Sequence, residues 1–208
     1  MKILAINGSP KKNIERSATH FLLQKVLEGA KSVCDYETEL LNLSEYSLLH
    51  CNGCERCVKS QCPLDEKDDF LKIEEKLLEA DAIIFGSPSY FGSPSGLIKT
   101  LMDRSRDLKM PESKLAGKIA SAVSVSGLRV GGQEATVEAL VRFALGQGMI
   151  IVGALGHPWF NAPLPVGTLQ YDLEGKVKFR KIDDDPVSIK DAFLLGERIA
   201  KIGEKLFG

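Results

Sequence analysis

The chain has 208 residues, a length that suits one large domain, and its composition is that of an ordinary globular protein. Hydrophobic residues at 44% are sufficient for a packed core, and the formal net charge of −1 argues against a nucleic-acid partner. No apolar stretch approaches the ~20 residues that span a bilayer, which argues against a membrane partner. The apolar run at residues 1–6 is too short for a secretory signal, so we expect a cytoplasmic protein.

Strand and helix patterns alternate through the first half of the chain. Short apolar or alternating segments predict strands, and segments with apolar residues at helical spacing predict helices between them. Strands are predicted at residues 2–6, 37–43 and 82–86, and helices at 17–29, at 68–80 and from 94 to about 104. We expect Ser93 to cap this last helix, with Pro94 at its first position.

The second half continues the alternation and then departs from it. Strands are predicted at 118–125 and 149–155, and helices at 133–145 and 189–206. Residues 158–186 form a proline-rich segment and an insertion in which apolar residues alternate around Glu174-Gly175, namely Leu169, Tyr171, Leu173, Val177 and Phe179. This pattern predicts a β-hairpin, and an isolated hairpin needs support from the domain or from a neighbouring subunit.

Five strands that alternate with five helices predict a doubly wound parallel sheet covered on both faces. Right-handed crossovers leave few topologies, and a flavodoxin-like α/β domain over 1–208 with strand order 2-1-3-4-5 fits best. Ligands bind such sheets beyond the carboxyl ends of the strands. The loops that begin near residues 7, 50, 86 and 126 should therefore carry the functional groups.

Four of the five cysteines lie in one loop, at residues 48–66: Cys51, Cys54, Cys57 and Cys62. The spacing C-x2-C-x2-C-x4-C-P resembles the bacterial iron–sulfur signature. Four thiolates also suit tetrahedral zinc, although the second C-x2-C knuckle that is usual across a longer spacer is lacking. Disulfides would require an oxidising compartment. An iron–sulfur cluster, zinc and a metal-free loop are therefore the alternatives, and Cys34 is expected to be a small buried residue.

The loop over residues 8–19 joins a predicted strand to a predicted helix. Its glycine, hydroxyls and lysines suit a phosphate group at a helix N-terminus, where free amides and the helix dipole favour an anion. It contains neither G-x-G-x-x-G nor G-x4-G-K-[ST], which excludes the usual dinucleotide and nucleoside-triphosphate loops. A monophosphate such as that of FMN fits better, and a solvated loop with a helix cap is the alternative.

Two further loops carry groups suited to a planar ring. Tyr90 and Phe91 are adjacent in a turn of glycine, proline and serine, where they can stack on or edge a ring. The alternative is a hydrophobic staple for the next helix. The loop over residues 125–133 is rich in glycine and contains Arg129, and glycine allows a backbone to approach a ligand closely.

Together these loops resemble the NAD(P)H-dependent FMN reductase superfamily. The resemblance rests on Gly8-Ser9-Pro10, on Ser87 to Gly92, and on Ser126-Gly127 with Gly131-Gly132. The cysteine run after the second strand narrows it to the iron–sulfur flavoproteins. The segments at 103–105 and 129–134 also resemble that group, and the agreement covers residues 1 to about 156 and the last helix.

The resemblance implies an oxidoreductase with one FMN and one 4Fe–4S cluster per subunit, assembled as a homodimer or homotetramer. Electrons would pass from a donor such as ferredoxin or NAD(P)H, by way of the cluster and FMN, to a small acceptor. By position, the phosphate would be held by Ser9, Lys12, Ser17 and Thr19. The ring would be held by Pro88, Ser89, Tyr90, Phe91, Gly92, Ser126 and Gly127, and the cluster by the four cysteines of the run. The family usually has asparagine before the helix-start hydroxyl, where this chain has Arg16.

No side chain is expected to be catalytic, because the chemistry belongs to the flavin. His20, His50 and His157 are isolated and are predicted to be structural or surface residues, although His50 is placed to tune a cluster on Cys51. Two other functions stay open. One is an NAD(P)H-dependent FMN or quinone reductase whose cysteine loop is zinc-bound or empty, and the other is a pure electron carrier.

Overall fold

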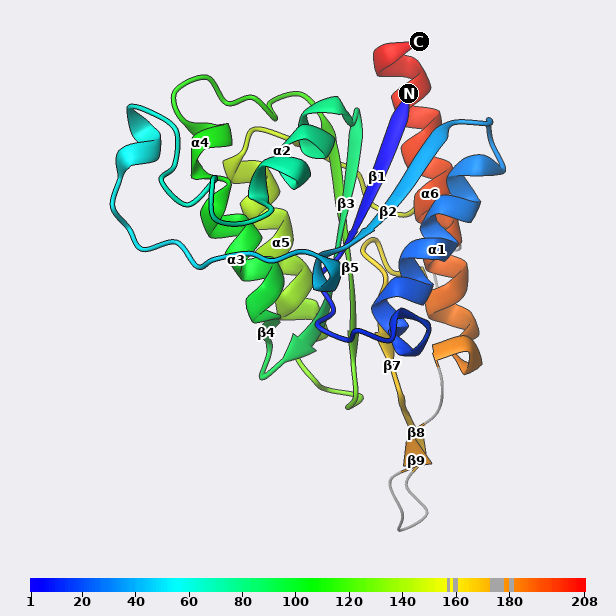
Figure 1. The fold of residues 1–208 in the computed structure, drawn as a ribbon. Helices are drawn as coiled ribbons and strands as arrows, with labels where there is room; N and C mark the ends of the chain where they lie inside the picture. Colours follow the sequence, from blue (N-terminus) through cyan, green and yellow to red (C-terminus); the bar gives the residue numbers. More distant parts are fainter. Residues whose placement is uncertain (157, 159–160, 173–177, 180–181) are drawn as a thin grey trace.

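The computed structural model describes residues 1–156, 158, 161–172, 178–179 and 182–208, and its elements alternate as Figure 1 shows. The strands are β1 (Lys2–Asn7), β2 (Glu37–Asn42), β3 (Ala82–Tyr90), β4 (Ser93–Pro94), β5 (Ile119–Ser126), β6 (Ile150–Ile151), β7 (Val166–Thr168), β8 (Gln170–Asp172) and β9 (Lys178–Phe179). The helices are α1 (Ala18–Lys31), α2 (Phe70–Glu79), α3 (Gly96–Arg104), α4 (Arg106–Lys109), α5 (Gln133–Gly146) and α6 (Pro186–Phe207). Short 3-10 turns lie at Ile14–Arg16, Leu43–Glu45, Arg56–Val58 and Ile182–Asp184.

The main sheet has the strand order β2-β1-β3-β5-β6, and each neighbouring pair is parallel. This confirms the predicted flavodoxin-like order 2-1-3-4-5. Within β1, Ala5 lies between Leu40 of β2 and Ile84 of β3. The central strands are apolar and buried along most of their length, as expected for a parallel sheet that is covered on both faces.

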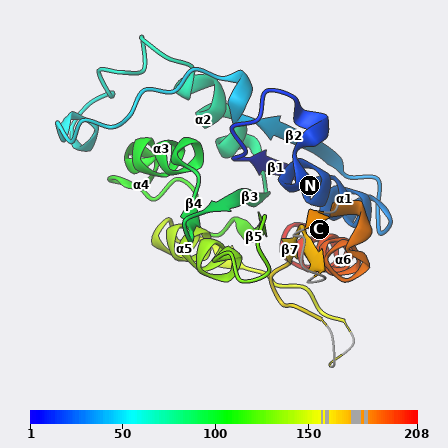
Figure 2. The same ribbon diagram turned by 90° about the horizontal axis from the view of Figure 1, so that it is seen from below.

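Helices cover both faces of this sheet. Helices α1 and α6 lie on one face, and α2, α3, α4 and α5 lie on the other (Figures 1 and 2). Two clusters of buried apolar side chains fill the two interfaces, one around Leu22 and Leu195 and the other around Phe70, Phe85 and Leu140. Among the described residues, no helix is both long enough and apolar enough to cross a bilayer.

The fifth strand is shorter than predicted. Only Ile150–Ile151 of the segment 149–155 pairs with β5, at the start of that strand. At the other end of β5, the strand β7 pairs with it instead. The chain turns away because the amide of Ala154 donates to the carbonyl of Pro163 at 2.6 Å. A Cβ atom at Gly153 would lie 2.7 Å from the same carbonyl oxygen, so the two segments are in close contact.

The predicted start of α3 is wrong by two residues. Ser93–Pro94 forms β4, which pairs antiparallel with the end of β3 through Tyr90 and Ser93. Ser95 is the helix cap instead, since its hydroxyl accepts from the amide of Ile98 at 3.4 Å. The two serines have the same capping chemistry, and the tight turn after β3 determines which one caps the helix.

The predicted hairpin is present in its two strands, since β8 and β9 pair antiparallel. Its expected turn at Glu174-Gly175 lies outside the described residues, and so does His157. The expectation that Cys34 is buried is wrong, because this side chain is exposed in the connection between α1 and β2. Connections of this kind run over the surface of a domain.

Helices α1 and α6 pack backbone against backbone. A Cβ atom added at Gly196 would lie 1.8 Å from the carbonyl oxygen of Val26, and one added at Gly29 would lie 2.0 Å from that of Phe193. Neither obstacle is a flexible side-chain end that could turn aside. The pair therefore requires glycine at both positions.

We expect Gly196→Ala to lower the free energy of unfolding by about 1–3 kcal/mol, because the methyl group must push the two helices apart. Gly146→Ala is a matched control, since Gly146 is exposed at the end of α5 with nothing within 4 Å of an added Cβ atom. The control should be neutral or should stabilise by up to about 1 kcal/mol. Urea unfolding followed by circular dichroism measures both values, and equal stabilities would contradict the helix contact.

Candidate functional site

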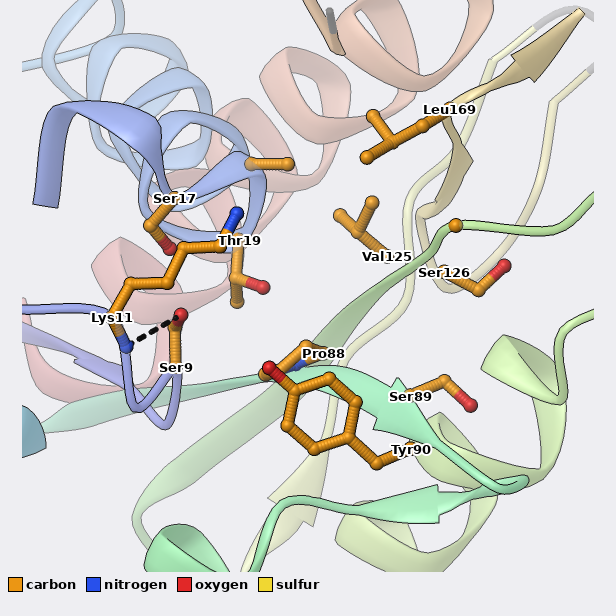
Figure 3. A pocket seen from close by; sticks show the side chains of 12 residues that line it. Ser9, Lys11, Ser17, Thr19, Pro88, Ser89, Tyr90, Val125, Ser126 and Leu169 are labelled. Atoms are coloured by element: carbon orange, nitrogen blue, oxygen red, sulfur yellow. Dashed lines mark hydrogen bonds between the residues drawn. The ribbon is translucent and has the colours of Figure 1, made fainter. Parts of the chain in front are cut away.

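Three loops meet at the carboxyl edge of the sheet and enclose a cavity of about 130 Å³ (Figure 3). The lining residues include most of the predicted cofactor-binding set: Ser9, Ser17, Thr19, Pro88, Ser89, Tyr90, Ser126 and Gly127. Lys11, Ala18, Val125 and Leu169 complete the lining. Hydroxyl groups gather at the end nearest α1, and Tyr90 lies across the cavity from them (Figure 3).

Two larger cavities adjoin this one and extend it along the edge. One, of about 530 Å³, shares Ser17, Ala18 and Leu169 with it. The other, of about 520 Å³, shares Ser89, Ser126 and Gly127 with it and brings in the predicted Phe91 and Gly92. The three cavities form one groove, here called the flavin groove. Lys12, which the sequence predicted as a phosphate ligand, is exposed and does not line these cavities. Its neighbour Lys11 lines the first cavity instead.

One end of the flavin groove, here called the phosphate end because the sequence predicts the phosphate there, lies at the start of α1. The Ser17 hydroxyl accepts from the amide of His20 at 3.2 Å, so Ser17 is the helix cap. The first amides of a helix have no partner within the helix, and its dipole favours an anion there. The Lys11 ammonium donates to the carbonyl of Arg16 at 2.8 Å, which places its charge over the same loop. These donors fit the monophosphate of FMN.

A buried amide network behind this loop was not found from the sequence. Asn7 and Asn42 are register partners at the ends of β1 and β2, and the Asn7 amide donates to Oδ1 of Asn42 at 3.0 Å. The same oxygen lies 2.8 Å from Nδ1 of His20, which therefore carries the proton. Oδ1 of Asn7 accepts from the amide of Ser9 at 3.1 Å. The network thus fixes the phosphate loop, and its sequence signal is an asparagine that ends each of two strands.

Two loops are joined at the ring end of the flavin groove. The Ser89 hydroxyl donates to the carbonyl of Gly131 at 2.6 Å. Gly132 has a φ of 76°, and a Cβ atom there would lie 2.3 Å from Cα of Gly92. Glycine is required at position 132 on both counts. The glycine-rich loop and the turn after β3 therefore form one wall.

Gln133, a second residue that the sequence reasoning missed, holds this wall from inside. Its Oε1 accepts from the amide of Gly131 at 3.0 Å and from the Ser126 hydroxyl at 2.8 Å, while its Nε2 donates to the carbonyl of Arg129 at 3.0 Å. Because its hydroxyl is bonded within the loop, Ser126 offers a ligand mainly its backbone. A glutamine at the first position of a helix after a glycine loop would be the signal to look for.

The cysteine loop runs between β2 and α2 and projects beyond α4 (Figures 1 and 2). Cys51 and Cys54 are exposed, and Cys57 and Cys62 are half-buried. Gly53 and Glu55 have positive φ angles of 69° and 60°, so the backbone between the cysteines turns tightly. The loop holds one short 3-10 turn, Arg56–Val58.

Burial is the main cause that raises the pKa of the Cys57 thiol. Arg106 lowers it, and Asp107, Cys62 and Cys51 raise it further. Four free thiols in one loop, at this spacing, are a donor set that fits an iron–sulfur cluster. In the part of the chain that the structure describes, no three His, Cys, Asp or Glu side chains gather around one point. A four-iron cluster binds its four cysteines through separate irons, so it does not require one common point.

Both ends of the cysteine loop are fastened at its base. The amide of Leu49 donates to Oδ2 of Asp68 at 2.8 Å, and Ser47 and Asp69 bond to each other twice. Arg104 of α3 forms an ion pair with Asp68 and donates to the carbonyl of Leu49 at 3.2 Å. We call this arrangement, together with the Asp65–Arg104 ion pair, the loop neck.

His50, just outside Cys51, bonds to α3 as well. Its Nδ1 lies 2.6 Å from the hydroxyl of Thr100, which in turn donates to the carbonyl of Gly96. The predicted role of His50 in tuning a cluster stays a prediction, and its structural partner is now known. His20 likewise has a structural partner in Asn42.

The fold and the flavin groove define a flavodoxin-like protein. The WrbA-like flavodoxin of Agrobacterium tumefaciens has this fold with a TM-score of 0.60 and 19% identity, over 99% of this chain and 98% of that one. A flavodoxin from the domain Archaea has it with a TM-score of 0.53 and 16% identity, over 98% of this chain and 99% of that one. Identities this low show the fold alone.

Sequence relatives narrow the class. Residues 1–158 match the family described as NADPH-dependent FMN reductase. An iron–sulfur flavoprotein of Archaeoglobus fulgidus is 39% identical over 98% of this chain and 96% of its own length. One of Methanocaldococcus jannaschii is 34% identical over 97% of both chains. The chain belongs to the iron–sulfur flavoproteins of the NADPH-dependent FMN reductase family, and it is a flavin-dependent oxidoreductase.

We expect Asn42→Ala to weaken FMN binding about tenfold, because the buried Asn7 amide loses its acceptor and releases the loop at Ser9. Flavin fluorescence quenching during titration of the apoprotein gives the dissociation constant. Asn13→Ala is the matched control, since Asn13 lies in the same loop and its side chain makes no capping hydrogen bond. Equal affinities for the two variants would contradict the role of the network.

A second prediction concerns acid stability at the loop neck. Burial raises the pKa of Asp68, but hydrogen bonds from Arg104 and from the amides of Leu49 and Phe70 outweigh it and hold the pKa below its ordinary value. The stabilisation is therefore complete above the unfolded-state pKa of about 3.9 and is lost as the pH falls through the lower folded-state pKa.

The measurement is urea unfolding of the wild type and Asp68→Asn across this range. At pH 7 the variant should be less stable by about 3–5 kcal/mol, and the difference should shrink as the pH falls below about 4. Asp103→Asn, which removes an exposed partner of Lys99, should stay within about 1 kcal/mol of the wild type. A difference that does not change between pH 7 and pH 3 would refute the ionised pair.

Proposed function

We propose that this protein accepts electrons from a one-electron donor such as ferredoxin and delivers them to a small acceptor. It would do so with a 4Fe–4S cluster on Cys51, Cys54, Cys57 and Cys62 and with FMN in the flavin groove. The observation that carries the proposal is that one chain combines a four-thiol loop with a separate groove built for a phosphate and a ring.

The flavin groove supplies binding and orientation rather than acid–base groups. The start of α1, with the hydroxyls of Ser9 and Ser17, would hold the phosphate. Pro88 and Tyr90, with the predicted Phe91 and Gly92, would border the ring on one side, and Val125 and Leu169 would exclude water on the other. Bound FMN exchanges electrons singly or as a hydride, so it supplies the link between a one-electron donor and a two-electron acceptor.

The cysteine loop supplies thiolates at the surface. Its cysteines are exposed or half-buried, so a protein donor could approach them closely. Ligation requires that all four thiols lose their protons, and a cationic centre promotes this loss where neighbouring thiolates oppose it. A cluster bound there transfers one electron at a time at a potential that its surroundings set.

A homodimer or homotetramer accounts for the apolar rim of the flavin groove. The side chains of Phe91 and Val130 are almost completely exposed, and both border the cavity of about 520 Å³. Phe91 is also held at a positive φ of 52°, which is unusual for an aromatic residue. A neighbouring subunit over this rim would bury both side chains.

Direct reduction by NAD(P)H is the second candidate function, with zinc or no metal in the cysteine loop. The observation in its favour is the same cavity of about 520 Å³, which is large enough for a second ligand beside the ring end of the groove. Rapid flavin bleaching by NADPH alone would support this candidate. A requirement for ferredoxin would exclude it, and a lack of turnover with oxygen, peroxide or quinone would favour a pure electron carrier.

Protein purified without air should contain roughly four irons, four sulfides and one FMN per chain. Cys54→Ala should lose the iron and sulfide but keep FMN, because the cysteine loop and the flavin groove are separate. Cys34→Ala, an exposed cysteine outside the run, should keep all three and serves as the control. Iron, sulfide, zinc and flavin analyses measure the outcome. Zinc or no metal in the wild type would refute the cluster.

A further inference from the structure

Helix α3 touches both candidate cofactor sites. At its N-terminus, the amide of Ser95 donates to the Ser87 hydroxyl at 2.9 Å, and the Ser95 hydroxyl donates to the carbonyl of Gly8. Ser87 ends the buried part of β3, and Gly8 begins the phosphate loop. The first turn of α3 is thereby fixed to the ends of two strands, next to residues Ser9 and Pro88 that line the flavin groove.

The other end of α3 holds the cysteine loop. Thr100 and Arg104 are four residues apart, so they lie on one face of the helix. Thr100 bonds to His50, which precedes the first cysteine of the run. Arg104 reaches Leu49 on the same side of the loop and Asp65 on the far side, just beyond the last cysteine. The helix therefore fastens the loop both before and after its four thiols.

The contacts of Arg104 are buried and directional. Its side chain is 1% exposed, as is that of Asp65, and that of Asp68 is 0% exposed. One nitrogen donates to Asp65 at 2.7 Å, and the guanidinium carbon lies 4.7 Å from the centre of the Phe70 ring. A planar guanidinium fits this fork of carboxylates and stacked ring, whereas a lysine ammonium would not.

Arg104 also keeps its positive charge at the loop neck, where it bonds to Leu49 and Asp65. Burial lowers the pKa of Arg104, but Asp68, Asp65 and the charge of Cys62 raise it above its ordinary value, so the guanidinium stays charged. Nε of Arg104 and Oδ2 of Asp65 are buried and have no hydrogen-bond partner. Each of these two unpartnered buried atoms costs some stability relative to a fully bonded pair.

We propose that Arg104 and Thr100 are positioning residues for the iron–sulfur cluster, which set the ends of the cysteine loop and hold a guanidinium charge at the loop neck, between Leu49 and Asp65. The inference rests on the proposed function, because it presupposes a cluster on the loop. Closing the loop at its neck confines the four thiols before any iron binds. A nearby positive charge favours the reduced, more negative state of a cluster.

The test uses the full-length holoprotein and four variants: Arg104→Gln, Arg104→Lys, Thr100→Val and Lys99→Gln. Lys99→Gln is the matched control, because Lys99 lies on the same helix but pairs with Asp103 at the surface. Each protein is loaded anaerobically with iron, sulfide and FMN. The readouts are iron and sulfide per chain, the rate of cluster loss to a chelator, the reduction potential of the cluster and the FMN dissociation constant.

We expect Arg104→Gln to lose its cluster about tenfold faster than the wild type, or more, because charged hydrogen bonds at both loop ends disappear. Its cluster should have a lower reduction potential, while FMN affinity should change less than about twofold because the first turn of α3 is intact. Arg104→Lys should keep the potential but lose the cluster faster, since it retains the charge without the fork. Lys99→Gln should match the wild type.

Thr100→Val keeps the inference testable if Arg104→Gln does not fold, because it removes the bond to His50 and, within α3, only the hydroxyl bond to the carbonyl of Gly96, whose helical backbone stays in place. It should lose the cluster about threefold faster with normal FMN binding. Wild-type rates and potentials in both Arg104→Lys and Thr100→Val would overturn the inference, as would parallel loss of FMN and cluster. Wild-type protein without iron and sulfide would instead refute the proposed function and this inference with it.

Discussion

Burial of the central strands on both faces is the constraint from which the placement of the sites follows. Strands β1, β3 and β5 are covered by helices over most of their length, so polar groups are accommodated mainly where the strands end. Asn7, Ser87 and Ser126 occupy such positions, and each is buried and hydrogen-bonded. The flavin groove is formed by the loops that leave these strand ends. Its polar groups are therefore part of the same network that completes the sheet, and the groove is rigid where the phosphate and the ring would bind.

Helix α3 links this rigid edge to the more exposed cysteine loop. Nine helical residues rise about 13 Å, so the groove and the loop neck are attached to opposite ends of one short element. The N-terminal attachment depends on Ser95, and the C-terminal attachment depends on Arg104. Each site thus has its own loops and ligands but shares a mechanical support. A change in the loops would stay local to one site, whereas a shift of α3 along its axis would disturb both.

The fold was predictable because the pattern of apolar residues that marks strands and helices is local in the sequence. The errors arise where contacts between distant segments determine where an element begins or ends. Apolar runs located the strands, and the crossover rule with the flavodoxin-like topology predicted their order, but the fifth strand shortens where a later proline segment returns against it. Ser93 and Ser95 are equivalent caps by sequence, and only the pairing of β4 with β3 separates them. Cys34 was misplaced because cysteine is usually buried, whereas this one lies in a surface connection. Asn42 and Arg104 were missed because each acts through a partner 35 or more residues away.

The loop neck explains how a long, irregular surface loop is held at its base. The entropy cost of bringing the two ends of a loop together rises only slowly with loop length. Strong contacts at the base can therefore close a long loop that has little regular structure of its own. The closure here consists of a guanidinium between Asp65 and Asp68 together with backbone bonds from Leu49. None of these groups is a thiol, so the base of the loop can form before iron arrives. Stability of the loop base is thus assigned to residues other than the four cysteines. The cysteines, which are exposed or half-buried, are therefore not required to close the loop.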